Sequence, residues 1–187
     1  MMSLTKTVVL LLMAGLMPAH ELPENRATLV LRDKTHVTVT LFVNYPEALH
    51  AAISPQRPFP EFLIVLSNMN AEELTKVLVR AQTKFEASTK LYLSGPARKE
   101  VSLTNWAWPD AKQVQGMLQR QIMQTMVDPA AHPHESPAEI RVEGNAFQEI
   151  GSLMMQFPPE FQKVLVVSYR PNQVWAERGV VSPEIKF

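Results

Sequence analysis

Residues 35–43 read Thr-His-Val-Thr-Val-Thr-Leu-Phe-Val, and polar and apolar side chains alternate strictly along most of this segment. One face would carry Val37, Val39, Leu41 and Val43, and the other would carry His36, Thr38 and Thr40. Such alternation of β-branched residues is typical of a strand with one buried face. Residues 26–32, rich in Leu, Val and Thr, precede it across an Asp33-Lys34 turn signal, so we expect a β-hairpin.

Helical periodicity follows this hairpin. It predicts a short helix over residues 45–53, a second from Pro60, a third after Asn70 and a fourth over residues 110–127. Asn70 precedes Glu73 by three residues, which is the spacing of a capped helix start. In the fourth helix the expected apolar stripe consists of Ala111, Val114, Met117, Leu118, Ile122 and Met126.

Further strands are expected around and after these helices. Their predicted ranges are 89–94, 100–105, 138–143, 150–157, 163–169 and 173–177. Residues 164–167 (Val-Leu-Val-Val) are apolar on both faces, which predicts a central strand covered on both sides. This order of elements favours an α+β fold with an antiparallel, sandwich-like sheet and inserted helices.

Composition limits the class of protein. The 187 residues are 46% apolar, which is sufficient for one domain with a sizeable core. The 18 basic and 18 acidic side chains balance, which argues against nucleic-acid binding. The absence of cysteine excludes disulfides and thiolate metal sites.

The first nineteen residues have the pattern of a secretory signal peptide. Lys6 precedes the eleven-residue apolar run 7–17, and Pro18-Ala19 leads into a polar stretch. The run is too short to span a bilayer, which needs about 20 residues as a helix. We therefore expect cleavage after Ala19, a single mature domain over residues 20–187 without a transmembrane segment, and a periplasmic or secreted location in a bacterium.

Catalytic motifs are absent from the sequence. It contains no GxSxG, HExxH, Walker or GxGxxG motif, and its six glycines form no phosphate-binding loop. Glu72 and Glu73 fit the first turn of a helix better than acid–base work, because carboxylates there favour the helix dipole. No enzyme class gains support from these residues.

Three histidines form the candidate metal site: His20, His132 and His134. His132 and His134 would project to one side of an extended segment. Cleavage after Ala19 would make His20 the first residue, so that its α-amine and imidazole could chelate one ion. Three nitrogens would suit Cu(II) or Ni(II). A solvated loop beside a frayed terminus is the alternative. For His36 we expect an exposed or hydrogen-bonded structural role, and for His50 we expect half-buried packing.

Two further groups of side chains allow more than one reading. Trp106 and Trp108 would face the same way in a strand, either as a stacking platform or as packing residues, and Trp175 lies in the last expected strand. Met117, Met123 and Met126 could offer thioethers to Cu(I), although core packing accounts for them as well.

The two ends of the mature chain, residues 20–33 and 163–175, resemble an uncharacterised group of secreted proteobacterial proteins. They are also similar to exported β-domains found beside nickel/cobalt permease-type membrane proteins, which likewise begin with Ala-His at the signal junction. The first resemblance implies no activity and no site residues. The second implies a connection with metal.

Three functional hypotheses follow. The first is a non-enzymatic binding or accessory module of the cell envelope, whose partner would be another envelope protein. The alternative is a periplasmic copper- or nickel-binding protein that uses His20 with His132 and His134. A third is a copper mono-oxygenase built on an N-terminal histidine.

Overall fold

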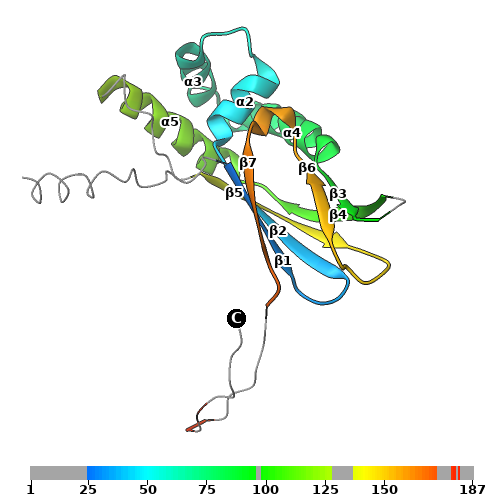
Figure 1. Cartoon of the computed structure of the whole chain (residues 1–187). Coiled ribbons are helices and arrows are strands. Elements are labelled where there is room, and N and C mark those ends of the chain that lie inside the picture. Colours follow the sequence, from blue (N-terminus) through cyan, green and yellow to red (C-terminus); the bar gives the residue numbers. More distant parts are fainter. Residues whose placement is uncertain (1–24, 96–97, 128–136, 172–177, 180, 182–187) are drawn as a thin grey trace, which may run out of the picture.

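The structure is a computed structural model that describes residues 25–95, 98–127, 137–171, 178–179 and 181. Its strands are β1 (Asn25–Leu31), β2 (His36–Val43), β3 (Lys90–Leu93), β4 (Lys99–Ala107), β5 (Ala138–Asn145), β6 (Leu153–Gln156) and β7 (Val164–Tyr169). They form one seven-stranded sheet in the order β6-β3-β4-β5-β2-β1-β7. The sheet is curled into a half-barrel (Figure 1).

The expected hairpin is confirmed. β1 and β2 pair antiparallel, with Leu29 opposite Val39 and Ala27 opposite Leu41. The alternate residues Val37, Val39, Leu41 and Val43 are all buried, so the period of two marks the concave face of the sheet. The turn is held by Asp33, whose Oδ1 accepts hydrogen bonds from the backbone N–H groups of Thr35 and His36 at 2.7 and 2.8 Å.

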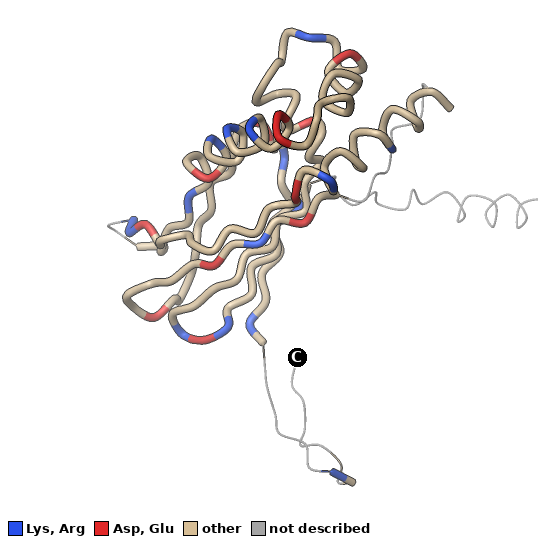
Figure 2. Tube along the Cα trace, turned by 180° about the vertical axis from the view of Figure 1, so that it is seen from behind, with Lys and Arg blue, Asp and Glu red and all other residues tan. Residues whose placement is uncertain are grey.

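Helices gather at one end of the half-barrel (Figure 1). They are α2 (Tyr45–Ile53), α3 (Phe59–Ser67), α4 (Ala71–Ser88) and α5 (Ala111–Val127). The predicted cap of α4 is confirmed, because Asn70 Oδ1 accepts from the N–H of Glu73 at 2.9 Å. One side of α4 is buried through Leu74, Leu78, Ala81 and Phe85, while Lys76, Arg80 and Lys84 add charge to this helix (Figure 2).

The curl of the sheet brings inner side chains close to one another at Gly144 of β5. A Cβ atom at this position would lie 2.9 Å from Val37 Cγ1 and 3.0 Å from Leu91 Cδ2. A larger residue would therefore force β2 and β3 apart, which explains glycine in this strand.

The strand predicted to be central is an edge strand, so that prediction is wrong. Among the described strands, β7 pairs only with β1, in parallel, and it ends the strand order. Its apolar residues are partly open to solvent: Val166 is 47% exposed and Tyr169 is 58% exposed. An apolar run can belong either to a central strand or to an uncovered edge, and periodicity does not distinguish them.

The α+β class is confirmed by the mixture of helices with a largely antiparallel sheet. The sandwich-like arrangement is not confirmed, because the described strands belong to one curled sheet. A sandwich needs a second sheet to cover the first, whereas here α4 and Phe161 bury against the inner side.

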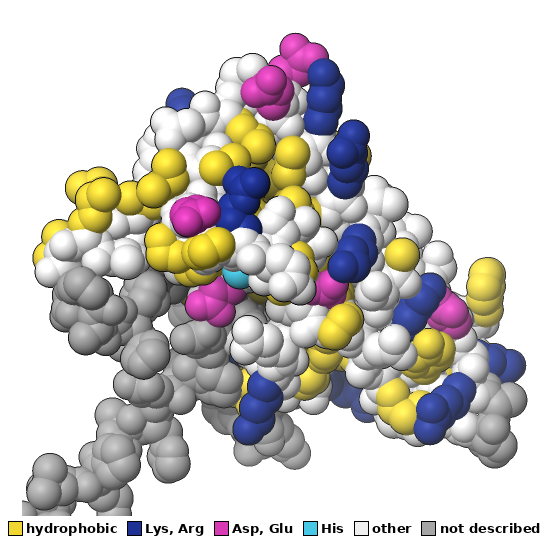
Figure 3. Space-filling model, turned by 90° about the horizontal axis from the view of Figure 1, so that it is seen from above, with side chains coloured by type: hydrophobic (Ala, Val, Ile, Leu, Met, Phe, Trp, Pro, Cys, Tyr) yellow, Lys and Arg dark blue, Asp and Glu magenta, His cyan; other side chains and the backbone are white. Residues whose placement is uncertain are grey.

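Only the first part of α5 follows its predicted stripe. Val114 and Leu118 are fully buried, but Met126 is 76% exposed, which corrects its assignment to the core. Hydrophobic side chains accordingly appear at the outer end of this helix (Figure 3). None of the helices in the described ranges is both long enough and apolar enough to cross a bilayer.

Candidate binding cleft

The residues predicted to bind metal, His20, His132 and His134, lie outside the described residues. Within the described part of the chain, no three His, Cys, Asp or Glu side chains are grouped to hold a metal ion. His36 has the expected hydrogen-bonded role, with Nδ1 2.6 Å from Asn145 Oδ1. His50 is half-buried as expected, and its ring centroid lies 5.0 Å from that of Phe62.

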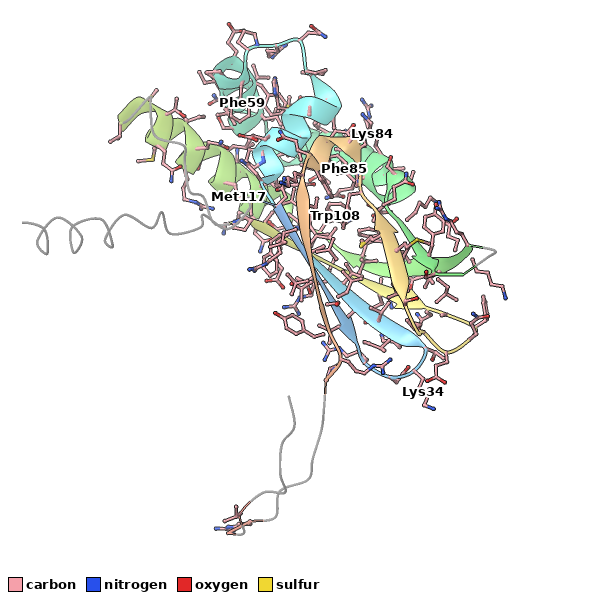
Figure 4. The ribbon with its side chains drawn as sticks, viewed as in Figure 1. Lys34, Phe59, Lys84, Phe85, Trp108 and Met117 are labelled. Carbon is pink, nitrogen blue, oxygen red and sulfur yellow. The ribbon has the colours of Figure 1, made fainter. Side chains whose placement is uncertain are left out.

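Trp106 and Trp108 stack with their ring centroids 5.5 Å apart and 10° between their planes. The prediction that both rings face the same way is therefore confirmed. Trp108 also contacts Tyr45 and Phe85, and its Nε1 donates a hydrogen bond to Glu86 at 2.7 Å. Trp108 acts as a packing residue at the helical end (Figure 4). Trp175 lies outside the described residues.

The open side of the half-barrel lies between its two edge strands, β6 and β7. One short segment joins them, the 3₁₀ helix η2 (Pro159–Phe161). Phe161 is fully buried, and its ring centroid lies 5.0 Å from that of Phe85 on α4. The structure is thus closed by aromatic packing at the helical end, while β6 and β7 diverge from η2 toward the other end (Figure 1).

Two polar contacts hold η2 in this position. Asn25 Nδ2 donates to the carbonyl of Phe161 at 2.7 Å, and its Oδ1 accepts from the N–H of Asn44 at 2.8 Å. Lys84 Nζ lies 2.6 Å from Glu160 Oε1. Burial raises the pKa of Glu160, but the hydrogen bond from Lys84, a hydrogen bond from the backbone N–H of Glu160 and the charge of Lys84 together outweigh burial, so the pKa lies below its usual value.

Away from η2, the diverging strands leave a cleft of about 490 Å³. Its lining is mostly apolar and comes from β1, β2, β6, β7 and the loop before β6. The apolar members are Leu29, Leu31, Val37, Ile150, Leu153 and Val166, and Ser152, Ser168, Tyr169 and Arg170 add polar groups. This volume falls within the usual range for ligand pockets, about 300–1,000 Å³.

The floor of the cleft is fixed by backbone hydrogen bonds. Ile150 N–H donates to the carbonyl of Lys34 at 2.7 Å, and Ala146 N–H donates to that of Thr35 at 2.9 Å. These bonds tie the loop before β6 to the β1–β2 turn, at the end of the molecule where Lys34 lies (Figure 4). Backbone hydrogen bonds therefore fix the floor of the cleft. One of its walls is β7, whose outer edge is unpaired among the described strands.

Two further hollows lie on the outer face of the sheet and are more polar. One, of about 390 Å³, contains Arg26, whose guanidinium carbon lies 4.5 Å from the ring centroid of Phe42. The other, of about 500 Å³, contains Trp108 and Arg120. Both include Arg141, which pairs with Glu139 at 2.5 Å. Arg26 and Arg141 each contact a neighbouring side chain, Phe42 and Glu139 respectively.

Sequence analysis missed the cleft. The sequence predicts Val37 on the buried face of a strand and residues 164–167 in a central strand, and neither prediction indicates a cleft. The available signal was that β7 is uncharged and apolar on both faces, although the same pattern fits a buried strand. Comparisons of the chain with models of protein families, with curated proteins and with solved structures give no match.

Proposed function

We propose that this protein is an exported, non-enzymatic binding module of the cell envelope. In this proposal the cleft between β6 and β7 binds an extended, apolar segment of another envelope protein. The observation that carries it is the uncharged apolar strand β7, whose outer edge is unpaired among the described strands and which borders an apolar cleft. The export signal at residues 1–19 supports the compartment, since its pattern is that of a secretory peptide.

The unpaired edge supports an extended ligand. A β-strand in water exposes a row of backbone donors and acceptors along its free edge, and a peptide can pair with that row. β7 has no charged residue and no proline that would oppose such pairing. An extended peptide would therefore gain backbone hydrogen bonds along the whole of β7.

The apolar lining of the cleft favours a ligand with apolar side chains. In β7, Val166 and Ser168 lie beside Ala27 and Leu29 of β1, on the concave side. A strand added to β7 would project every second side chain toward the same side. Val, Leu or aromatic side chains at those positions would reach the apolar lining, while the intervening positions would face the outer surface.

A labelled peptide of alternating valine and threonine tests this binding mode by fluorescence anisotropy. Val166→Lys should weaken binding by about tenfold or more, because the charge enters the apolar wall of the cleft. Val79→Lys on α4 is the matched control, since Val79 is 52% exposed and Val166 is 47% exposed. Equal affinities for the two variants would contradict the cleft as the binding site.

A photo-reactive residue at position 166 tests the partner class in cells. We expect adducts with an envelope protein, and no such adducts from the same group at position 79. Equal adducts from both positions would contradict the proposal. N-terminal sequencing of the exported protein should give His20 as the first residue, and a retained Met1 would contradict export with processing.

The second candidate function is copper or nickel binding by His20 with His132 and His134. The position of His20 after Ala19 and the His-x-His spacing favour it. Calorimetric titration with Cu(II) should show tighter binding by the chain that begins at His20 than by one carrying an extra residue before it. The extra residue separates the α-amine from the imidazole chelate. Equal affinities would exclude this site.

A further inference from the structure

The outer face of the sheet carries a group of polar side chains that the cleft does not use. In β1, Arg26 and Thr28 lie on this face and are half-buried. Their partners in β2 are Phe42 and Thr40, and Arg141 of β5 lies opposite Thr40 on the other side of β2. Because opposed residues in neighbouring strands share a face, these side chains border one hollow of about 390 Å³.

Arg26 is a half-buried cation that makes no hydrogen bond within the described residues. Its guanidinium carbon lies 4.5 Å from the ring centroid of Phe42, so this group rests on an aromatic ring and not on a carboxylate. Its Nε atom is enclosed by the protein and has no hydrogen-bond partner among the described residues. Enclosing a cation without an anion costs free energy, so an anionic ligand would be stabilised by meeting Arg26.

Arg141 contributes a second guanidinium to the hollow. Its Nε donates to Glu139 Oε1 at 2.5 Å, which uses only one of its several N–H donors. Two arginines and one glutamate line the hollow, which leaves a net charge of +1. The charge of the hollow therefore favours an anion.

The hydroxyl groups of Thr28 and Thr40 indicate which anion fits. β2 lies between β1 and β5, so Thr40 stands between the strands that carry the two arginines, with Thr28 beside it. Neither hydroxyl forms a hydrogen bond with the described residues, so each can donate to a ligand. One guanidinium satisfies both oxygens of a planar carboxylate, whereas a tetrahedral phosphate accepts from several directions. Donors from three strands therefore favour phosphate.

We infer that this hollow binds the phosphate group of an organic phosphate through Arg26, Arg141 and the hydroxyls of Thr28 and Thr40. A volume of about 390 Å³ accommodates a phosphate with a small organic group. The balanced charge of the chain argues against a polyanion such as nucleic acid, so the ligand offers a single phosphate. The site lies on the opposite face of the sheet from the cleft and does not depend on the proposed function.

Titration of the full chain with inorganic phosphate tests this site by proton–nitrogen NMR. The Nε–H group of Arg26 is enclosed, so its exchange with water should be slow enough for its signal to be observed. Loss of one such signal in Arg26→Lys assigns it. Phosphate should shift this signal in a saturable way, with a dissociation constant of about 1 mM or below.

Variants of the lining residues test which groups hold the phosphate, with the backbone amide signal of Thr40 as the common readout. Arg26→Gln should weaken phosphate binding by about tenfold or more, and Thr28→Val should weaken it by about threefold. Arg120→Gln is the matched control, because it removes the same charge from the neighbouring hollow and Arg120 does not line this one. It should change the affinity by less than about twofold.

Three outcomes would overturn the inference. Equal weakening by Arg26→Gln and Arg120→Gln would show that phosphate responds to the net charge alone. Tighter binding of acetate than of phosphate would show that the hollow takes a carboxylate. The absence of a saturable shift of the Arg26 signal and of the Thr40 amide signal would show that no phosphate site exists.

Two organic phosphates identify the source of the phosphate group. Binding of glycerol phosphate that is tighter than that of inorganic phosphate would support a soluble ester. Co-sedimentation with phosphatidylglycerol vesicles that Arg26→Gln abolishes and Arg120→Gln retains would support a lipid headgroup. If glycerol phosphate binds no more tightly than inorganic phosphate and the vesicles do not bind, the organic phosphate is refuted as the ligand.

Discussion

The two ends of the half-barrel use the same strands in opposite ways. At the helical end, the space inside the sheet is filled by α4 and η2, where Tyr45, Phe85 and Phe161 are fully buried. At the other end, β1 and β7 border a cleft of about 490 Å³. The difference shows that burial in this fold depends on what covers a strand, since strands of the same sheet contribute both to the packed interior and to the wall of the cleft.

The largest effect is expected from Phe85→Ala, which would break the closed end. Phe85 contacts Tyr45, Trp108 and Phe161, so its removal leaves a cavity where four aromatic rings meet. The free energy of unfolding in urea should fall by about 3–5 kcal/mol. Val79→Ala, at an exposed position of the same helix, should change it by less than about 0.5 kcal/mol. A similar small change for both would mean that the aromatic cluster does not hold the closed end.

A smaller loss is expected from Asn25→Ala, which would detach η2 from β1. Asn25 serves two backbone groups, the carbonyl of Phe161 and the N–H of Asn44. Leaving both without partners should lower the unfolding free energy by about 2 kcal/mol. Asn68→Ala is the control, because Asn68 is exposed and bonds within its own helix end. If the two variants are equally stable, Asn25 does not hold η2 to β1.

The ion pair between Lys84 and Glu160, at the closed end, should make a pH-dependent contribution to the free energy of unfolding. The pKa of Glu160 is lower in the folded protein than in the unfolded chain, where it is near 4.5. The stabilisation by ionised Glu160 is therefore fully present above the pKa of the unfolded chain, and it is lost as the pH falls through the pKa of the folded protein. Lys84 is half exposed, so screening limits the contribution to about 1 kcal/mol or less. The difference in unfolding free energy between the wild type and Glu160→Gln should shrink from pH 7 to pH 3. A constant difference would contradict this role of Lys84.

The smallest effect is expected from Val166→Asp at the open end. A central strand would make this substitution severely destabilising, because it would bury an unpaired charge. Val166 is 47% exposed on an edge strand, so the expected loss is below about 1 kcal/mol. Ile140→Asp, at a fully buried position of β5, provides the contrast and should unfold the domain. A loss of several kcal/mol at position 166 would show that β7 is covered far more completely than its edge position implies.

Local patterns predicted the elements themselves. The period of two over residues 36–43 identified β2 and its buried face, and Asn70 with Glu73 identified the start of α4, because both signals depend on residues close in sequence. The pairing of Trp106 with Trp108 followed from their spacing in the same way. The metal-site residues His20, His132 and His134 lie outside the described part of the chain, so that hypothesis stays a prediction.

Tertiary structure alone decided the order of the strands and hence the cleft. Nothing local to residues 164–169 specifies whether one neighbour or two will pair with them, and the parallel pairing with β1 joins residues more than a hundred positions apart. The same holds for Met126, whose helical spacing predicts a place in the apolar stripe, although its side chain is 76% exposed among the described residues. The sequence by itself determined which segments become strands and helices, because those preferences act over a few residues. Which surfaces became covered depended on contacts distant in sequence, and that is why an apolar run ended as the exposed wall of a cleft.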